Sequence, residues 1–150
     1  MTSEHPHTDS LDSLSRRLAG FKKIGWDFDE TLIAHPNSKN FWRYIHDNPY
    51  RQKHFVITFR TGYLLDSIWN DLNRERSPLR PYHFDGLFGV PESLYHGFMV
   101  GAPEGSPYLE WKGEKCRNLG IQILIDDATD HVITGCARYG IEYIHPDAFL

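Results

Sequence analysis

Carboxylates are concentrated in two short stretches of this sequence, and each stretch follows a run of apolar residues. The stretches are WDFDET, with Asp27, Asp29 and Glu30, and IDDATD, with Asp126, Asp127 and Asp130. Carboxylates that fold close together repel one another and raise one another's pKa unless a cation or a proton intervenes. Mg²⁺ relieves this conflict, because it prefers oxygen ligands and is often held by one or two carboxylates together with a substrate phosphate. The pattern therefore predicts that Asp27 and Asp126 share a divalent cation.

Short apolar runs alternate with segments of helical spacing along the chain. Strands are expected at 22–26, 54–58, 84–90, 121–125 and 141–144, with a further one at 95–100. Helices are expected at 10–20, 40–49, 62–76, 108–120 and 128–140. Alternation of this kind predicts an α/β fold with three Rossmann-like layers, in which a mostly parallel five-stranded sheet carries helices on both faces.

Polar side chains stand where the predicted strands finish. Asp27 follows the first strand, Thr58 ends the second, and Asp126 follows the strand at 121–125. In open parallel sheets, ligands bind beyond the carboxyl ends of the strands, where loops and helix N-termini converge. We therefore expect these three residues to meet at one edge of the sheet.

Four segments in this order resemble the four motifs of the haloacid dehalogenase superfamily. They are IGWDFDETL, HFVIT, WKGEKCRNLG and ILIDDATD, and the likeness runs from about Lys22 to Ile144. Each segment lies at a predicted strand end or helix, and the four in order are a more specific signal than any one motif alone. The resemblance implies a Mg²⁺-dependent phosphatase on the Rossmann-like fold of that superfamily.

By this resemblance, Asp27 would attack the phosphorus of a phosphomonoester and become an aspartyl-phosphate. Asp29 would protonate the leaving oxygen and then activate water, and its main-chain carbonyl would be a metal ligand beside Asp27 and Asp126. Thr58 would hydrogen-bond a phosphoryl oxygen, and Lys112 would neutralise the negative charge that develops on it. A carboxylate at position 29 favours hydrolysis over the other reactions of the superfamily.

Four further residues receive supporting roles. Lys115 follows Lys112 by one helical turn and competes with it for the same role. By the resemblance, Asp127 and Asp130 would bind the ion through water or orient the lysine, although helix capping would also account for Asp130. Arg60, in the TFRTG segment beyond the second strand, either grips a second anionic group of the substrate or forms an ordinary ion pair.

The 150 residues are predicted to form one domain over 21–150, preceded by an N-terminal tail and short helix over 1–20. Members of the superfamily commonly insert a cap domain after the first or the second motif. Here one helix and its loops fill the interval from Asp27 to Thr58, and the next interval leaves room for at most a small lid at 90–108. No large cap domain is expected. By resemblance, such an open site fits macromolecular phosphoesters, nucleotides or sugar phosphates.

Composition narrows the class of protein. A formal net charge of −4 lacks the basic excess expected of a nucleic-acid binder. The two cysteines, Cys116 and Cys136, are too few for a disulfide framework and fit a reducing cytoplasm. No apolar stretch approaches the ~18 residues of a membrane span, and no apolar targeting segment is expected at the N-terminus. The expected partner is a phosphorylated substrate, small or macromolecular, and the oligomeric state stays open.

Three other functions would use the same residues. A narrower version is a small 5′-nucleotidase-like enzyme, and a phosphotransferase would pass the phosphoryl group to an alcohol instead of water. The third is a non-catalytic module that binds phosphate or metal without turnover. The presence of every group that catalysis requires favours an enzyme over this binding module.

Overall fold

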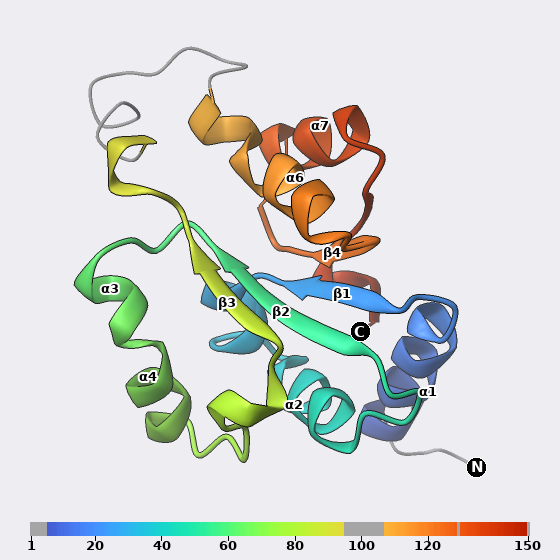
Figure 1. The fold of residues 1–150 in the computed structure, drawn as a ribbon. Coiled ribbons are helices and arrows are strands. Elements are labelled where there is room, and N and C mark those ends of the chain that lie inside the picture. Colours follow the sequence, from blue (N-terminus) through green and yellow to red (C-terminus); the bar gives the residue numbers. More distant parts are fainter. Residues whose placement is uncertain (1–5, 95–106, 129, 150) are drawn as a thin grey trace.

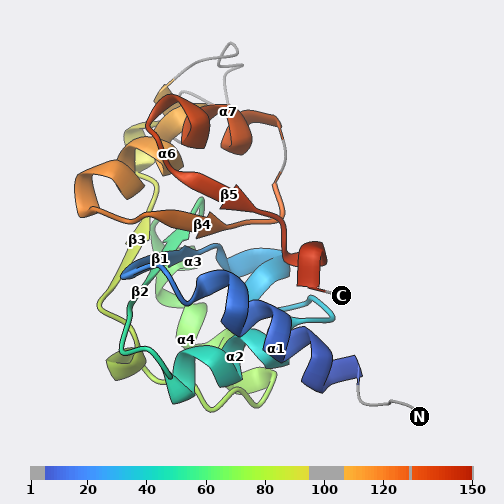
Figure 2. The same ribbon diagram turned by 90° about the vertical axis from the view of Figure 1, so that its right-hand side faces the viewer.

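The computed structural model describes residues 6–94, 107–128 and 130–149, and at 6–9, 107, 130 and 131 it describes the backbone alone. Five parallel strands form a single sheet between two layers of helices (Figure 1 and Figure 2). The strand order β3-β2-β1-β4-β5 puts β1 at the centre. This arrangement confirms the predicted α/β, Rossmann-like fold.

The elements alternate as the sequence predicts. The strands are β1 (Lys23–Trp26), β2 (Lys53–Thr58), β3 (Gly86–Gly89), β4 (Ile123–Ile125) and β5 (Glu142–Ile144). The helices are α1 (Pro6–Leu18), α2 (Ser38–Asp47), α3 (Tyr63–Asp66), α4 (Ile68–Arg74), α6 (Pro107–Leu119) and α7 (Asp130–Arg138). Three short turns are η1 (Phe28–Leu32), η2 (Pro81–His83) and η3 (Pro146–Phe149). The strand expected at 95–100 and most of the lid expected at 90–108 lie outside the described residues.

The first helix begins earlier than the sequence pattern predicts. We expected a start at Ser10, but α1 begins at Pro6. Proline suits the first position of a helix because its fixed φ is already helical and its missing N–H would have no partner there. Leu14 and Leu18 of α1 are fully buried in the core, so this helix packs against the rest of the chain.

The helix expected at 62–76 is divided into α3 and α4 at Ser67. The carbonyl oxygen of Leu64 accepts hydrogen bonds from Ser67 Oγ at 2.8 Å and from Arg60 Nη1 at 3.2 Å. These side-chain bonds compete with the helical hydrogen bond that the same carbonyl would otherwise accept. The break therefore has a local cause that amphipathic spacing does not reveal.

Side-chain alternation along the strands divides the core into two layers. Ile24, Trp26, Val56, Ile123 and Ile125 belong to the layer that packs under α1, α2 and α4. Phe55, Ile57 and Leu124 belong to the layer that packs under α6 and α7. Successive residues of a strand point to opposite faces of the sheet, and both faces of this sheet are covered. This is why the strands are continuous apolar runs in the sequence.

Helices α6 and α7 cross at two glycines. A Cβ atom added at Gly113 would overlap the carbonyl group of Gly135, and one added at Gly135 would lie 3.3 Å from the Cα of Glu110. The first contact is with backbone, which cannot move aside as a flexible side chain can. The absence of a side chain at position 113 therefore lets the helices approach closely, next to Lys112.

Replacing Gly113 with alanine is expected to lower the free energy of unfolding by about 1–3 kcal/mol, since overpacking outweighs the better helix propensity of alanine. Urea denaturation would measure the change. Gly20→Ala is the matched control, because a Cβ at that position meets no atom within 4 Å. Equal stability of the two variants would contradict the close helix crossing.

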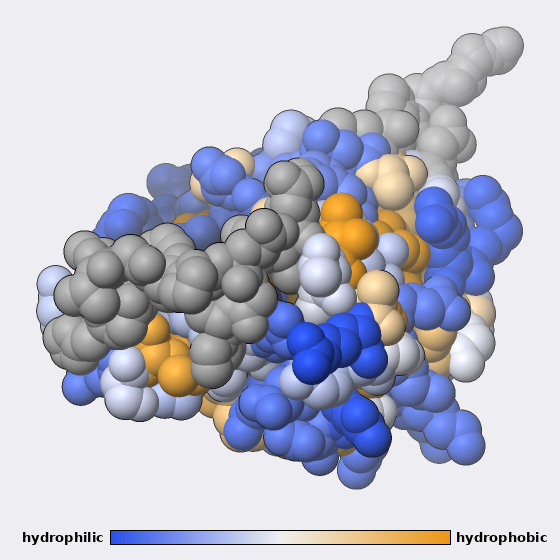
Figure 3. All heavy atoms as spheres, turned by 90° about the horizontal axis from the view of Figure 1, so that it is seen from above, coloured by the Kyte–Doolittle hydropathy of each residue, from blue (hydrophilic) through white to orange (hydrophobic). Residues whose placement is uncertain are grey.

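The face formed by α6 and α7 carries mainly hydrophilic side chains. Figure 3 looks down onto this face, and among its described residues the hydrophobic side chains occur in small groups. Ile133 of α7 is an exposed example. Among the described helices, none has both the length and the apolar character that crossing a membrane requires.

Candidate active site

The carboxyl ends of the three central strands bring the predicted site residues together. Trp26, the last residue of β1, is in register with Ile125 of β4 on one side and with Val56 of β2 on the other. The backbone N–H of Asp27 donates to the carbonyl oxygen of Ile125 at 2.9 Å, so the parallel ladder continues one residue beyond the strand. Asp27 and Asp126 therefore leave neighbouring strands at the same edge.

Lys112 joins these two carboxylates. Its Nζ donates to Asp27 Oδ1 at 2.7 Å and to Asp126 Oδ2 at 2.6 Å. The three side chains are almost completely buried, with exposed fractions of 1% for Lys112, 8% for Asp27 and 0% for Asp126. Nζ also lies 4.6 Å from the centre of the Phe59 ring. A buried ammonium thus holds two acids from opposite ends of the chain.

Asp127 extends the cluster to three carboxylates. One oxygen each of Asp27, Asp126 and Asp127 lie within 4.8 Å of one another, and Asp127 is half-buried. The sequence predicts only a supporting role for Asp127, whereas the structure groups its carboxylate with those of the two expected ligands. The Tyr143 hydroxyl lies 2.7 Å from the carbonyl oxygen of Asp126 and 2.6 Å from that of Ala128, so that its one proton is shared between the two and ties this backbone to β5.

Burial controls the protonation of this cluster. It raises the pKa of Asp27 to about 7, although the charge of Lys112 acts in the opposite direction. It also raises the pKa of Asp126 to about 6 against the same opposing charge. Burial alone would lower the pKa of Lys112, but the attraction of Asp27 and Asp126 outweighs it and raises that pKa. One ammonium therefore does not satisfy two buried carboxylates, which titrate near neutral pH.

The η1 turn carries the chain away from Asp27 in an unusual conformation. Asp29 has extended backbone angles. Glu30 has φ 57° and ψ 24°, which lie in the left-handed region that residues other than glycine rarely adopt. Thr31 is fully buried, and its Oγ1 lies 3.5 Å from Asp27 Oδ2. Four other described residues besides the glycines also have a positive φ, so this angle shows a tight turn and does not by itself mark a functional site.

Asp29 stands apart from the cluster and pairs with Arg60. Arg60 Nε donates to Asp29 Oδ2 at 3.0 Å, and Nη2 donates to Asp29 Oδ1 at 2.7 Å. Nη1 donates to Asp71 Oδ2 at 2.7 Å, and the guanidinium carbon lies 4.7 Å from the centre of the Phe28 ring. Hydrogen bonds to Asp29, followed by those to Asp71, raise the pKa of Arg60 above its usual value. Arg60 thus forms ion pairs within the chain, one of the two alternatives from the sequence.

The other predicted residues are placed as follows. Thr58 is buried at the end of β2, and its Oγ1 accepts a hydrogen bond from the backbone N–H of Arg60 at 3.0 Å. Lys115 lies over the Phe88 ring at 4.4 Å, so the structure brings Lys112 rather than Lys115 to the two carboxylates. Asp130 is the first residue of α7, and its side chain lies outside the described part of the structure.

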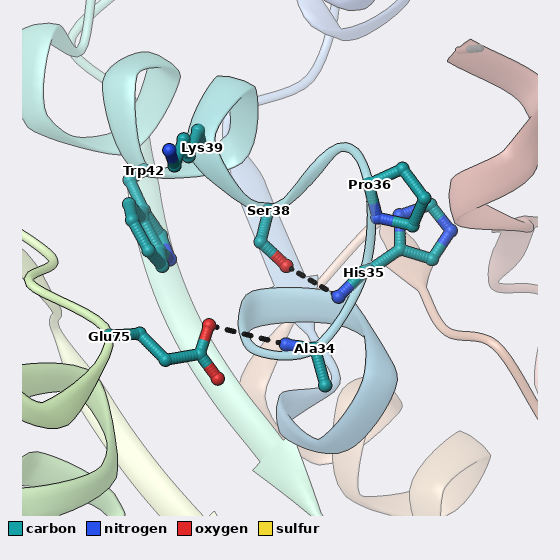
Figure 4. Close-up of a pocket in the computed structure, with 7 residues that line it drawn as sticks. All are labelled: Ala34, His35, Pro36, Ser38, Lys39, Trp42 and Glu75. Atoms are coloured by element: carbon teal, nitrogen blue, oxygen red, sulfur yellow. Dashed lines mark hydrogen bonds between the residues drawn. The ribbon is translucent and has the colours of Figure 1, made fainter.

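A separate pocket lies behind the η1 turn, between α2 and the end of α4. It has a volume of about 470 Å³, and Trp42, Ser38 and Glu75 are among the residues that line it (Figure 4). Its polar groups hold the loop that follows η1: Ser38 Oγ accepts from the N–H of His35 at 3.2 Å and donates to the carbonyl oxygen of Thr31 at 2.7 Å. None of the three clustered carboxylates lines this pocket.

Comparison with known proteins places the fold but assigns no function. No family model matches this sequence, and no curated protein matches it. A similar solved structure is that of an uncharacterized protein from Corynebacterium glutamicum, with a TM-score of 0.52 over 84% of this chain and 85% of that one. Since the two sequences are 12% identical, the likeness shows a shared fold alone. Membership of the haloacid dehalogenase superfamily stays a prediction from the motifs.

Proposed function

We propose that this protein is a Mg²⁺-dependent phosphatase that hydrolyses a phosphomonoester through an aspartyl-phosphate. The observation that carries the proposal is the buried Lys112 ammonium, which bridges Asp27 and Asp126 beside a third carboxylate, Asp127. This cluster has more carboxylates than cations in a largely buried position, which is costly unless a proton or a further cation neutralises the negative charge.

The donor atoms suit a hard divalent ion. Asp27, Asp126 and Asp127 offer carboxylate oxygens, the ligand type that Mg²⁺ prefers, and among the described residues no histidine or cysteine that would favour zinc belongs to the cluster. When bound, Mg²⁺ would balance the negative charge of the carboxylates and of the phosphoryl oxygens.

The residues of the chain would then divide the reaction into two displacements. In the first, a carboxylate oxygen of Asp27 forms a bond to phosphorus, the bond from phosphorus to the leaving oxygen breaks, and Asp29 gives that oxygen a proton. In the second, Asp29 takes a proton from water while the water oxygen attacks phosphorus, which releases phosphate and regenerates the Asp27 carboxylate. Lys112 and Thr58 would stabilise the charge on the transferring group.

The direct test is release of phosphate from an aryl phosphate by the purified protein. Turnover is expected with added Mg²⁺ and is expected to disappear with a chelator and to return when Mg²⁺ is restored. Calorimetry that shows Mg²⁺-dependent phosphate binding without turnover, across aryl phosphates and nucleoside monophosphates, would favour a binding module and contradict the proposal.

Binding of Mg²⁺ is also expected to stabilise the fold in a pH-dependent way. At a concentration 100 times the dissociation constant, the ion would raise the free energy of unfolding by about 2.7 kcal/mol. The ligands must be deprotonated, and the pKa values of Asp27 and Asp126 are raised to about 7 and about 6. The gain is therefore expected nearly in full at pH 8, and it should decrease as the pH falls through 7 and 6.

Thermal unfolding with and without Mg²⁺ at pH 8, 7, 6 and 5 would measure this gain. Asp126→Asn is expected to remove most of it. Asp47→Asn is the matched control, because Asp47 is an exposed residue of α2 that pairs with Arg43 on the surface. A gain that is independent of pH, or one that Asp126→Asn leaves intact, would argue against this ligand set.

A further inference from the structure

Arg60 is held at every nitrogen of its guanidinium group. Nε and Nη2 donate to Asp29, and Nη1 donates to Asp71. Nη1 also donates to Ser67 Oγ at 3.0 Å and to the carbonyl oxygen of Leu64. The side chain is only 14% exposed. A guanidinium occupied in this way would have to leave several partners before it could bind an anionic group of a substrate.

Arg60 connects one largely buried carboxylate, that of Asp71, with one exposed carboxylate, that of Asp29. Asp71, on α4, is 16% exposed, whereas Asp29 is 53% exposed and stands beside the strained residue Glu30. Asp71 Oδ1 receives a second ion pair, at 3.0 Å, from Arg74. Asp71 is thus held in place on α4. Asp29 is the residue whose side-chain direction depends on Arg60.

Two parallel hydrogen bonds fix a carboxylate more strictly than one bond does. Arg60 Nε and Nη2 contact one oxygen each of Asp29, which sets both the position and the plane of that carboxylate. The Phe28 ring lies against the guanidinium and limits its movement further. Asp29 would otherwise be a short, half-exposed side chain in a turn, with freedom to rotate.

We propose that Arg60, anchored by Asp71, is a positioning residue that sets the direction of the Asp29 carboxylate for proton transfer. This inference rests on the proposed phosphatase function and concerns its second displacement, in which the Asp29 carboxylate takes a proton from water; with both oxygens accepting from Arg60, Asp29 is held in its proton-accepting form. Arg60 would act through Asp29 and not through contact with the substrate. Its removal should then slow the chemical step and leave substrate binding nearly unchanged.

The experiment compares Arg60→Met in the wild-type protein with the same change in an Asp29→Asn protein, using an aryl phosphate and saturating Mg²⁺. In the wild-type background, kcat is expected to fall about 10²-fold, as for a misplaced catalytic group, with KM nearly constant. In the Asp29→Asn background, Arg60→Met should change kcat less than about twofold, because the group it positions is already disabled.

Two further variants keep the test informative if Arg60→Met folds poorly. Arg60→Lys retains a positive charge near Asp71 but cannot make two parallel bonds, so it should also lower kcat at constant KM. Arg43→Met is the matched control, because Arg43 is an exposed arginine of α2 that pairs with Asp47 on the surface, and it should keep the wild-type kcat.

The outcomes separate the two proposals. An equal loss in both backgrounds, or a change confined to KM, would overturn the role of Arg60 while the phosphatase function stands. A wild-type protein without turnover would overturn the proposed function and this inference with it.

Discussion

Asp27→Asn is expected to reduce phosphate release by roughly 10³-fold or more, because an amide cannot form the aspartyl-phosphate. The fold should survive, since the asparagine oxygen can still accept the hydrogen bond from Lys112 Nζ. Burial raises the pKa of Asp27 to about 7, so the wild-type carboxylate carries a cost above that pH that the amide avoids. The variant is therefore expected to be at least as stable as the wild-type protein without Mg²⁺ at pH 8.

Steady-state turnover and urea denaturation of the same sample would separate lost chemistry from lost structure. Asp47→Asn again serves as the control, since it makes the same chemical change at an exposed position of α2. A folded Asp27→Asn protein that retains wild-type turnover would show that another group attacks the phosphorus.

Lys112→Met is expected to have the largest effect on stability. Removal of one partner from a buried charge network leaves Asp27 and Asp126 uncompensated, which typically costs about 3–5 kcal/mol. Burial already raises both pKa values, so the folded state binds more protons than the unfolded state above pH 4; without Lys112 both pKa values should rise further, and this excess should extend to higher pH. The free energy of unfolding should then decrease as the pH rises, and Mg²⁺ should restore part of it.

Lys115→Met is the matched control for this prediction, because it removes an ammonium from the same helix one turn away. Lys115 lies over the Phe88 ring, a contact that contributes about 0.5–1 kcal/mol at an exposed site. Urea denaturation between pH 5 and 8, with and without Mg²⁺, measures both variants. Equal losses for the two lysines would contradict the special position of Lys112.

The positions of Asp27, Thr58 and Asp126 could be predicted because they depend on patterns within short segments. Apolar runs covered on both faces mark the strands, and parallel strands put their carboxyl ends at one edge. The polar residue after each run is therefore placed by the fold as a whole. A small error in the predicted start of a strand does not move the polar residue at its end to another edge of the sheet.

Lys112 and Lys115 could not be separated in this way. Residues three apart on a helix share nearly the same face, so periodicity treats them alike. The structure separates them by packing, since α6 approaches α7 at Gly113 and Lys112 is buried beside that crossing. Such contacts between helices have no signal in a single sequence.

The pairing of Arg60 with Asp29 and Asp71 was also beyond prediction. It depends on the path of the loop after β2 and on the break between α3 and α4. Spacing predicts a continuous amphipathic helix over 62–76, which is wrong at Ser67, and it gives Asp71 no special role. The sequence offers one signal for this pairing, an acidic residue on the helix after Thr58. Acidic residues on surface helices are too common for this signal to be specific.

The pairing of β1 with β4 has a consequence for the newly made chain. Ile24 is in register with Ile123, a partner that the ribosome adds about 100 residues later. Asp27 is therefore synthesised long before Lys112 and Asp126, and its carboxylate can remain hydrated until they arrive. A nascent chain therefore cannot form the Asp27–Lys112–Asp126 cluster until residue 126 has been added and has left the ribosome.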